Sequence, residues 1–126
     1  MTIKKMNPEA KELWVEALES DRYRQICGDV SQTSENGNIK HMCVMGVLNH
    51  VYAIKHKKLD KYGMPKGSLA SDDHHGAVLK WAGIDKNTVD EMIERNDSRK
   101  TDSLDDVATG GYWSFKRFAA HIKKTL

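Results

Sequence analysis

Cys43 is the residue of this chain whose type and position most favour chemistry. It stands near the start of an uncharged stretch, residues 42–54, which predicts a helix that is apolar nearly all round. In the first turn of a helix, the dipole and the unpaired N–H groups favour the nucleophilic thiolate. Such a nucleophile needs a nearby base. His50 shares the helix face of Cys43, but the helical rise between them is about 10.5 Å, which is beyond hydrogen-bond reach.

A base for Cys43 would therefore come from another part of the chain. A second interpretation of Cys43 needs no base, because a small apolar residue can simply pack the start of a buried helix. The apolar surroundings of Cys43 favour this second interpretation. The histidines that remain as candidate bases are His41, His74, His75 and His121.

The run Asp72-Asp73-His74-His75 combines side chains that bind metals. Consecutive residues of a helix point about 100° apart, so the four side chains cannot converge on one ion. Capping carboxylates beside surface histidines are the better interpretation. We therefore predict no metal site, and no motif of the chain indicates a cofactor.

Lysines gather in and beside the segment 57–70, which has no helical or strand period and is predicted to be a surface loop. A solvated loop with extended lysine side chains is the simpler interpretation. The alternative is a surface that binds an anion. The lysines are Lys55, Lys57, Lys58, Lys61 and Lys66, of which Lys57, Lys58 and Lys61 are the candidate binding residues.

Tyr112 and Trp113 follow two glycines at the end of a polar segment, roughly residues 98–113. A flexible loop with an aromatic tip is a common kind of binding site. Equally, the two aromatic side chains could fold back onto the last helix as a hydrophobic staple. The sequence leaves both alternatives open.

Short helices and one hairpin have to position these residues. Asn7 and Pro8 are typical of a helix start, Gly83 of a helix end, and Asn36-Gly37 of a hairpin turn. We predict an α+β, mainly α fold with about five short helices around a buried central helix, in a single domain over 1–126. The predicted helices are 8–19, 42–54, 72–82, 88–95 and 115–124, and the hairpin covers about 27–41. Their predicted caps include Asp72, Thr88 and Ser114, and Asn96 is predicted to be a turn residue after the fourth helix.

Composition and charge argue against several classes of protein. The net charge is +2 with both signs spread along the chain, so nucleic acid is not an expected partner. The stretch 42–54 is shorter than the roughly 20 apolar residues that span a bilayer, so no membrane partner is expected. No apolar run follows the first residues, and the cysteines are Cys27 and Cys43 alone. We therefore expect a reduced, cytoplasmic setting, and we leave open whether the two cysteines pair.

Four pieces of the chain, in this order, resemble a family of small phage and prophage proteins. They are Trp14 to Gln25 with the motif Tyr23-Arg-Gln25, then Cys43-Val-Met-Gly-Val-Leu48, Asn96-Asp97, and Ser114-Phe115 to Ile122. The chain departs from the family pattern at Val44, where the family has a second cysteine, and in its polar insertion at about 98–113. A role for a paired thiol is therefore not carried over. The resemblance implies a viral or prophage origin, with the host cytoplasm as the location, and little about chemistry.

Three functional hypotheses follow. The first is a non-enzymatic phage-type accessory protein that binds a host macromolecule or a small anionic ligand, for example to inhibit a host enzyme or a defence system. The second is a cysteine-dependent hydrolase or transferase that uses Cys43. The third is a structural or homo-oligomeric protein whose apolar helix packs against a copy of itself. The residues favour binding over catalysis.

Overall fold

The protein is a small, mainly α-helical structure of the α+β class. The computed structural model describes residues 6–20, 22–26, 30–32, 40–61, 63–97 and 113–126. The helices within these residues are α1 (Pro8–Glu19), α2 (Val44–Lys55), a 3-10 helix η1 (Gly67–Ala70), α3 (Gly76–Ala82), α4 (Lys86–Asp97) and α6 (Phe115–Thr125). The strands are β1 (Tyr23–Gln25), β2 (Ser31–Gln32) and β3 (Lys40–Met42). The predicted fold class is confirmed.

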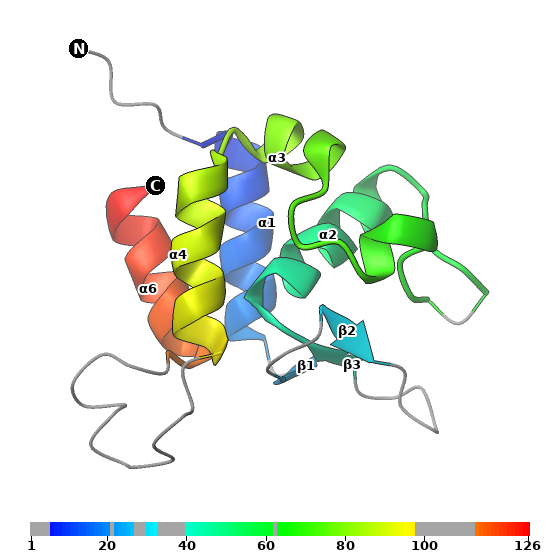
Figure 1. The fold of residues 1–126 in the computed structure, drawn as a ribbon, viewed down its shortest axis with the longest axis horizontal. Helices are drawn as coiled ribbons and strands as arrows, with labels where there is room; N and C mark the ends of the chain where they lie inside the picture. Colours follow the sequence, from blue (N-terminus) through cyan, green and yellow to red (C-terminus); the bar gives the residue numbers. More distant parts are fainter. Residues whose placement is uncertain (1–5, 21, 27–29, 33–39, 62, 98–112) are drawn as a thin grey trace.

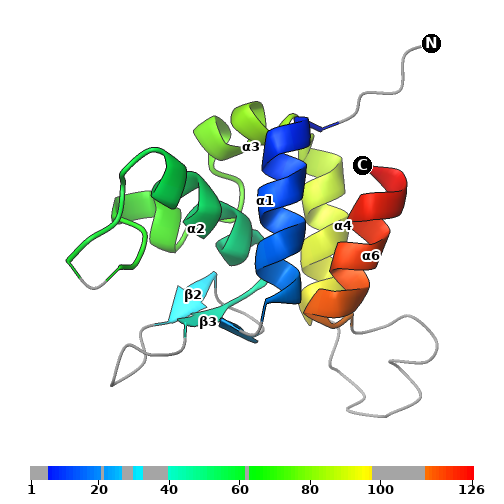
Figure 2. The same ribbon diagram turned by 180° about the vertical axis from the view of Figure 1, so that it is seen from behind.

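Helix α2 lies at the centre of the core, as the sequence predicts. Helices α1, α4 and α6 run side by side, and α2 lies beside α1 with the small sheet at its N-terminal end (Figures 1 and 2). Every residue of α2 from Val44 to Ala53 is buried. The indole of Trp14, itself fully buried on α1, donates a hydrogen bond to the carbonyl oxygen of Val44 (3.1 Å). This hydrogen bond therefore fixes the position of α1 along α2.

Local sequence signals account for the ends of α1 and α6. The side chain of Asn7 accepts a hydrogen bond from the Glu9 N–H (2.9 Å), and Pro8 occupies the first turn of α1. The hydroxyl of Ser114 accepts one from the Arg117 N–H (3.3 Å) at the start of α6. Both helices begin where the sequence predicts. Each buries one apolar stripe, and the stripe of α6 consists of Phe115, Phe118, Ala119 and Ile122.

The predicted starts of three helices are corrected. Helix α2 begins at Val44 and not at residue 42, because Met42 pairs in β3 and Cys43 is extended. Helix α3 begins at Gly76 because the Asp72 carboxylate accepts a hydrogen bond from the His74 N–H (2.9 Å), which forms a turn and not a helix cap.

Helix α4 begins at Lys86, so Thr88 is not its cap. The carboxylate of Asp85 accepts from the Thr88 N–H (2.8 Å). The helix also continues to Asp97, two residues beyond its predicted end, and Asn96 is a buried helical residue and not a turn residue.

The sheet has one more strand than predicted. Strands β2 and β3 pair antiparallel, with Ser31 opposite Met42, as the two arms of the predicted hairpin would. Its predicted turn, Asn36-Gly37, lies outside the described residues. Strand β1 adds to the other side of β3 in parallel, with Tyr23 opposite Lys40. Three residues are too few to show the alternation by which a strand is recognised. Among the described helices, none has the length and apolar run that crossing a bilayer requires.

Candidate functional site

Cys43 is a buried residue immediately before α2. Its exposed fraction is 5%, and it holds the N-cap position with an extended backbone instead of lying within the first turn. Its N–H donates to the carbonyl oxygen of Val30 (3.0 Å). Cys43 thus forms part of the packed junction between the sheet and α2.

The candidate bases for Cys43 are dispersed over the fold. His41 is half-buried on β3, and His75 is the N-cap residue of α3. The ring of His121 on α6 makes an edge contact with Trp113, with ring centroids 5.0 Å apart. His74 lies between two carboxylates. The four histidines thus lie on β3, around the start of α3 and on α6.

We expect the Cys43 thiol to react slowly in the folded protein, because a reagent reaches a 5% exposed side chain only when the structure opens. The measurement is labelling with a thiol reagent in a Cys27→Ser variant, so that Cys43 is the sole target. The same variant in denaturant provides the control for full reactivity. Labelling of the native protein as fast as of the denatured one would favour the cysteine-dependent enzyme.

His74 links the segment that precedes α3 to helix α4 through contacts with two carboxylates. Its Nδ1 lies 2.7 Å from an Asp73 carboxylate oxygen and its Nε2 lies 2.6 Å from one of Asp90. A neutral imidazole has a single N–H, so hydrogen bonds to carboxylates at both nitrogens require the protonated ring. Burial lowers the pKa of His74, but the hydrogen bonds to Asp90 and Asp73 and the charges of both outweigh it, so the pKa is raised above 6.5.

The raised pKa of His74 predicts a pH dependence of stability. Below pH 6.5 the folded and unfolded states both hold the proton, and the contribution of His74 is fully present. As the pH rises through the higher pKa of the folded state, this contribution is lost. Denaturant unfolding over this range should therefore show a decrease in stability in the wild type that is absent in His74→Gln. Because His74 and its two carboxylate partners are partly exposed, the decrease in the free energy of unfolding should not exceed about 1 kcal/mol. An equal decrease in both proteins would contradict the assignment.

The described residues of the lysine loop (57–66), which are 57–61 and 63–66, are held together by hydrogen bonds. Lys66 N–H donates to the Lys58 carbonyl (2.9 Å) and Asp60 N–H to the Met64 carbonyl (2.7 Å), which closes the loop across its neck. The Asp60 carboxylate also accepts from the Met64 N–H (3.0 Å). Four lysines of this loop are exposed: Lys57, Lys58, Lys61 and Lys66. The sequence predicts a loop over 57–70. Its first part is a closed turn that displays four cations, and its last four residues form the 3-10 helix η1 instead.

Two buried polar side chains of α2 anchor the lysine loop and the segment after it. The Nε2–H of His50 donates to the Gly63 carbonyl (2.9 Å), and its Nδ1 accepts from the hydroxyl of Tyr23 on β1. Burial raises the pKa of Tyr23 to about 12, against the lowering effect of the Arg22 charge, so the phenol remains a donor. Asn49 donates to the carbonyls of Leu69 (3.1 Å) and Asp72 (2.9 Å). Two buried side chains of α2 thus position the lysine loop and the segment that follows it.

Trp113 packs against α6, and Tyr112 lies outside the described residues. The Trp113 ring contacts Phe118, with centroids 5.4 Å apart. The guanidinium carbon of Arg117 lies 4.6 Å, and that of Arg95 5.5 Å, from the centre of the Trp113 ring. This is the packing that the staple alternative predicts for Trp113.

The two candidate binding segments do not form one surface. In Figure 1 the start of α6 lies on one side of the molecule and the lysine loop, which follows α2 in green, lies on the opposite side. Trp113 lies two residues before Phe115, the first residue of α6. A partner that contacts the lysine loop would therefore leave Trp113 uncovered unless it were as wide as the whole molecule.

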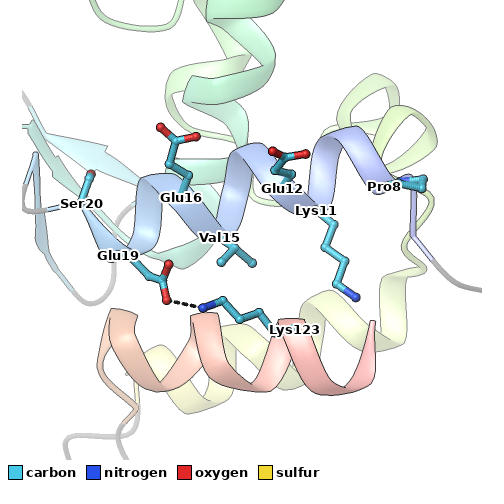
Figure 3. A pocket seen from close by; sticks show the side chains of 8 residues that line it. All are labelled: Pro8, Lys11, Glu12, Val15, Glu16, Glu19, Ser20 and Lys123. Atoms are coloured by element: carbon cyan, nitrogen blue, oxygen red, sulfur yellow. Dashed lines mark hydrogen bonds and ion pairs between the residues drawn. The ribbon is translucent and has the colours of Figure 1, made fainter.

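An open groove of about 600 Å³ runs along the outer face of α1 beside α6. Figure 3 shows Lys11 and Val15 pointing from α1 toward α6, and Glu12 and Glu16 pointing to the opposite side of α1. Glu19 and Lys123 form an ion pair across the two helices (2.6 Å). The groove lining is completed by Pro8 and Ser20. The sequence predicts no role for this outer face of α1.

The half-buried Gln25 and the fully buried Asn96 form an amide junction where four elements meet. Gln25 Nε2 donates to Asn96 Oδ1 (2.9 Å) and to the Trp113 carbonyl (2.7 Å), and its Oε1 accepts from the Phe115 N–H (3.0 Å). Asn96 Oδ1 also accepts from the Val44 N–H (3.1 Å), the first of α2. Cys43, the N-cap residue of α2, makes no side-chain capping bond. The side chain of Asn96 on α4 caps α2 instead.

Each of the four pieces that resemble the phage family contributes to this junction. Gln25 comes from the first, Val44 from the second, Asn96 from the third and Phe115 from the fourth. In this chain the four pieces thus meet through backbone groups and side-chain amides.

A family model matches nearly the whole chain. The match covers residues 6–126, and its description is domain of unknown function DUF8296. The chain belongs to the DUF8296 family. Comparison with curated proteins and with solved structures finds no match. The expectation of an uncharacterised family is confirmed for this DUF8296 protein.

The sequence does not predict the structural roles of several residues of this DUF8296 chain. They are Tyr23, Asn49 and His50, which position the lysine loop, and Gln25 and Asn96, which form the amide junction. A polar side chain within an uncharged helix was the available signal for Asn49 and His50. Such residues are rarely buried without a partner, so each indicates a contact that the local sequence does not contain.

Proposed function

We propose that this DUF8296 chain is a non-catalytic binding protein whose lysine loop engages an acidic surface of a partner protein. The observation that supports the proposal most is the closed, anchored loop with four exposed lysines. Ordering a flexible loop on binding costs free energy, and a loop already held by His50 avoids part of this cost. A cluster of like charges also raises the rate of encounter with an oppositely charged partner.

An acidic protein surface suits the lysine loop better than nucleic acid does. Lysines present compact point charges on flexible stems, and the loop offers a small footprint of them. Nucleic-acid binders carry a larger basic face, whereas this chain has a net charge of only +2. The loop therefore matches a local acidic patch and not an extended phosphate backbone.

The phage or prophage origin is part of the same proposal and rests on the sequence resemblance. An accessory protein of this kind would bind a protein of the host cytoplasm, for example to inhibit an enzyme or a defence system. The buried position of Cys43 supports binding over the cysteine-dependent alternative, because a nucleophile has to reach its substrate.

The proposal is tested with a variant in which Lys57, Lys58, Lys61 and Lys66 are all changed to Gln. The probe is polyglutamate on a sensor surface, with the full chain in solution. The wild type should bind, and the variant should bind roughly a hundredfold more weakly if each lysine contributes about 0.7 kcal/mol.

The matched control removes the same charge elsewhere, from four exposed lysines outside the loop: Lys80, Lys86, Lys116 and Lys124. This control variant should retain most of the binding. Equal losses in the two variants would mean that net charge and not the loop determines binding. Tighter binding to a DNA duplex than to polyglutamate would contradict the class of partner.

A further inference from the structure

The groove beside α1 has one acidic and one basic edge. Lys11 lies on the edge turned toward α6, and Glu12 and Glu16 lie on the opposite edge (Figure 3). Glu19 is already paired with Lys123. Within the described residues, the structure shows no ion pair for Lys11, Glu12 or Glu16. Both edges therefore present charges that an occupant of the groove can neutralise.

Between these edges the groove has an apolar floor. Val15 lies in the middle of α1 with an exposed fraction of 6%, and Pro8 lies at one end of the groove. An occupant that fits needs an apolar strip with cations along one side and carboxylates along the other. Helix α1 itself has this pattern on its outer face, with Val15 between Lys11 and the pair Glu12 and Glu16.

Two-fold symmetry brings the complementary edges together. A two-fold axis that runs along the groove exchanges its two edges, so that the acidic edge of one copy faces the basic edge of the other. Lys11 of each copy then faces Glu12 of the other copy, at the same level along the helix. The lining carries two lysines and three glutamates, so its positive and negative charges nearly balance. A surface whose charges all had the same sign would instead repel a second copy of itself.

We propose that the outer face of α1 is a self-association surface, on which a second copy of this chain packs around a two-fold axis parallel to α1. The two α1 helices and the flanking α6 helices then form a four-helix arrangement. The twelve residues of α1 rise about 18 Å, so the contact is small and belongs to the transient class of interfaces. The lysine loop takes no part in it, so this inference is independent of the proposed binding function.

The experiment measures the dissociation constant of the dimer by sedimentation equilibrium of the full chain at low salt. The wild type should be in a concentration-dependent equilibrium between monomer and dimer. Each of the reversals Lys11→Glu and Glu12→Lys places like charges opposite each other at two symmetric positions, and should weaken the dimer at least about tenfold. The double variant with both reversals should restore the wild-type constant, because the complementarity is restored.

Controls and contrary outcomes are equally definite. The reversals Lys80→Glu on α3 and Glu94→Lys on α4 make the same charge changes at exposed positions outside the groove and should leave the constant unchanged. Circular dichroism verifies that each variant is folded. A wild type that is monomeric at the highest accessible concentration overturns the proposal. A dimer that the single reversals leave unchanged, or that the double variant does not restore, also overturns it.

Discussion

Replacing Asn96 by Ala should lower the free energy of unfolding by roughly 3–5 kcal/mol. Asn96 is fully buried, and its side chain accepts from Gln25 and Val44 and donates to the Ile26 carbonyl (2.8 Å). Without it, the first N–H of α2 and the Ile26 carbonyl stay buried with a hydrogen bond lost, and each such group costs about 1–3 kcal/mol. Domains of this size are typically stable by about 5–15 kcal/mol, so the loss is a large fraction of the total.

Denaturant unfolding followed by circular dichroism measures the effect of Asn96→Ala. The matched control is Asn87→Ala, which removes the same side chain from an exposed position of the same helix and should change the stability by less than about 0.5 kcal/mol. If Asn96→Ala were as mild as the control, the amide junction would not hold the four elements together.

The second large effect is expected for Gly46→Ala, in the first turn of α2, the buried helix that the sequence predicts to be central. A Cβ atom at this position would lie 2.0 Å from the Val30 carbonyl oxygen and 3.1 Å from the Met42 Cβ. Because the first neighbour is backbone, the strand side of the junction has to move and the hydrogen bond from Cys43 to Val30 is strained. Alanine gains about 1 kcal/mol of helix propensity, but overpacking outweighs it, and we expect a net destabilisation of roughly 2 kcal/mol or more.

Gly76→Ala is the control for Gly46→Ala in the same unfolding measurement. Gly76 begins α3, and a Cβ there would have no neighbour within 4 Å. Its replacement should be neutral or stabilising by up to about 1 kcal/mol. A Gly46→Ala protein as stable as the wild type would mean that the backbone of Val30 does not approach α2 as closely as described.

The sequence predicts elements whose determinants are local. Asn7, Pro8 and Ser114 act within one turn of the helix that they start, so the beginnings of α1 and α6 are predicted correctly. The uncharged stretch 42–54 predicts a buried helix, and α2 is buried from Val44 to Ala53. A glycine within this helix suggests close approach by another backbone, most often that of a crossing helix, or by a ligand. At Gly46 the structure places the backbone of Val30, which lies next to β2 and not in a helix.

The sequence does not predict contacts between residues far apart along the chain. Gln25 meets Asn96 across 71 positions of sequence, and no local pattern links the two. Asparagine is a residue type that is common in turns, but the tertiary hydrogen bonds of Asn96 keep it within α4. Asp85 caps α4 in place of Thr88, although the capping-box spacing at Thr88 is formally correct. At Asn96 a buried tertiary partner overrides local preference, whereas at Asp85 one local cap replaces another.

The candidate site is likewise predicted only in part. The lysines of the loop are visible in the sequence, whereas its closure depends on the neck between Lys58 and Lys66 and on the anchor from His50 to Gly63. The two edges of the groove become visible only when α6 is placed beside α1 (Figure 3). Charge can be counted along the chain, but its arrangement on a surface depends on the fold.

The most direct test of the proposed binding function is a backbone amide NMR titration of the full chain with polyglutamate. We expect the largest chemical-shift changes within residues 57–66, together with the Tyr23 and His50 amides that support the loop through their side chains. The outer face of α1 should be much less affected, because its two lysines lie among three glutamates. Changes that are concentrated around Trp113, or that are spread evenly over all lysines of the chain, would contradict the lysine loop as the binding surface.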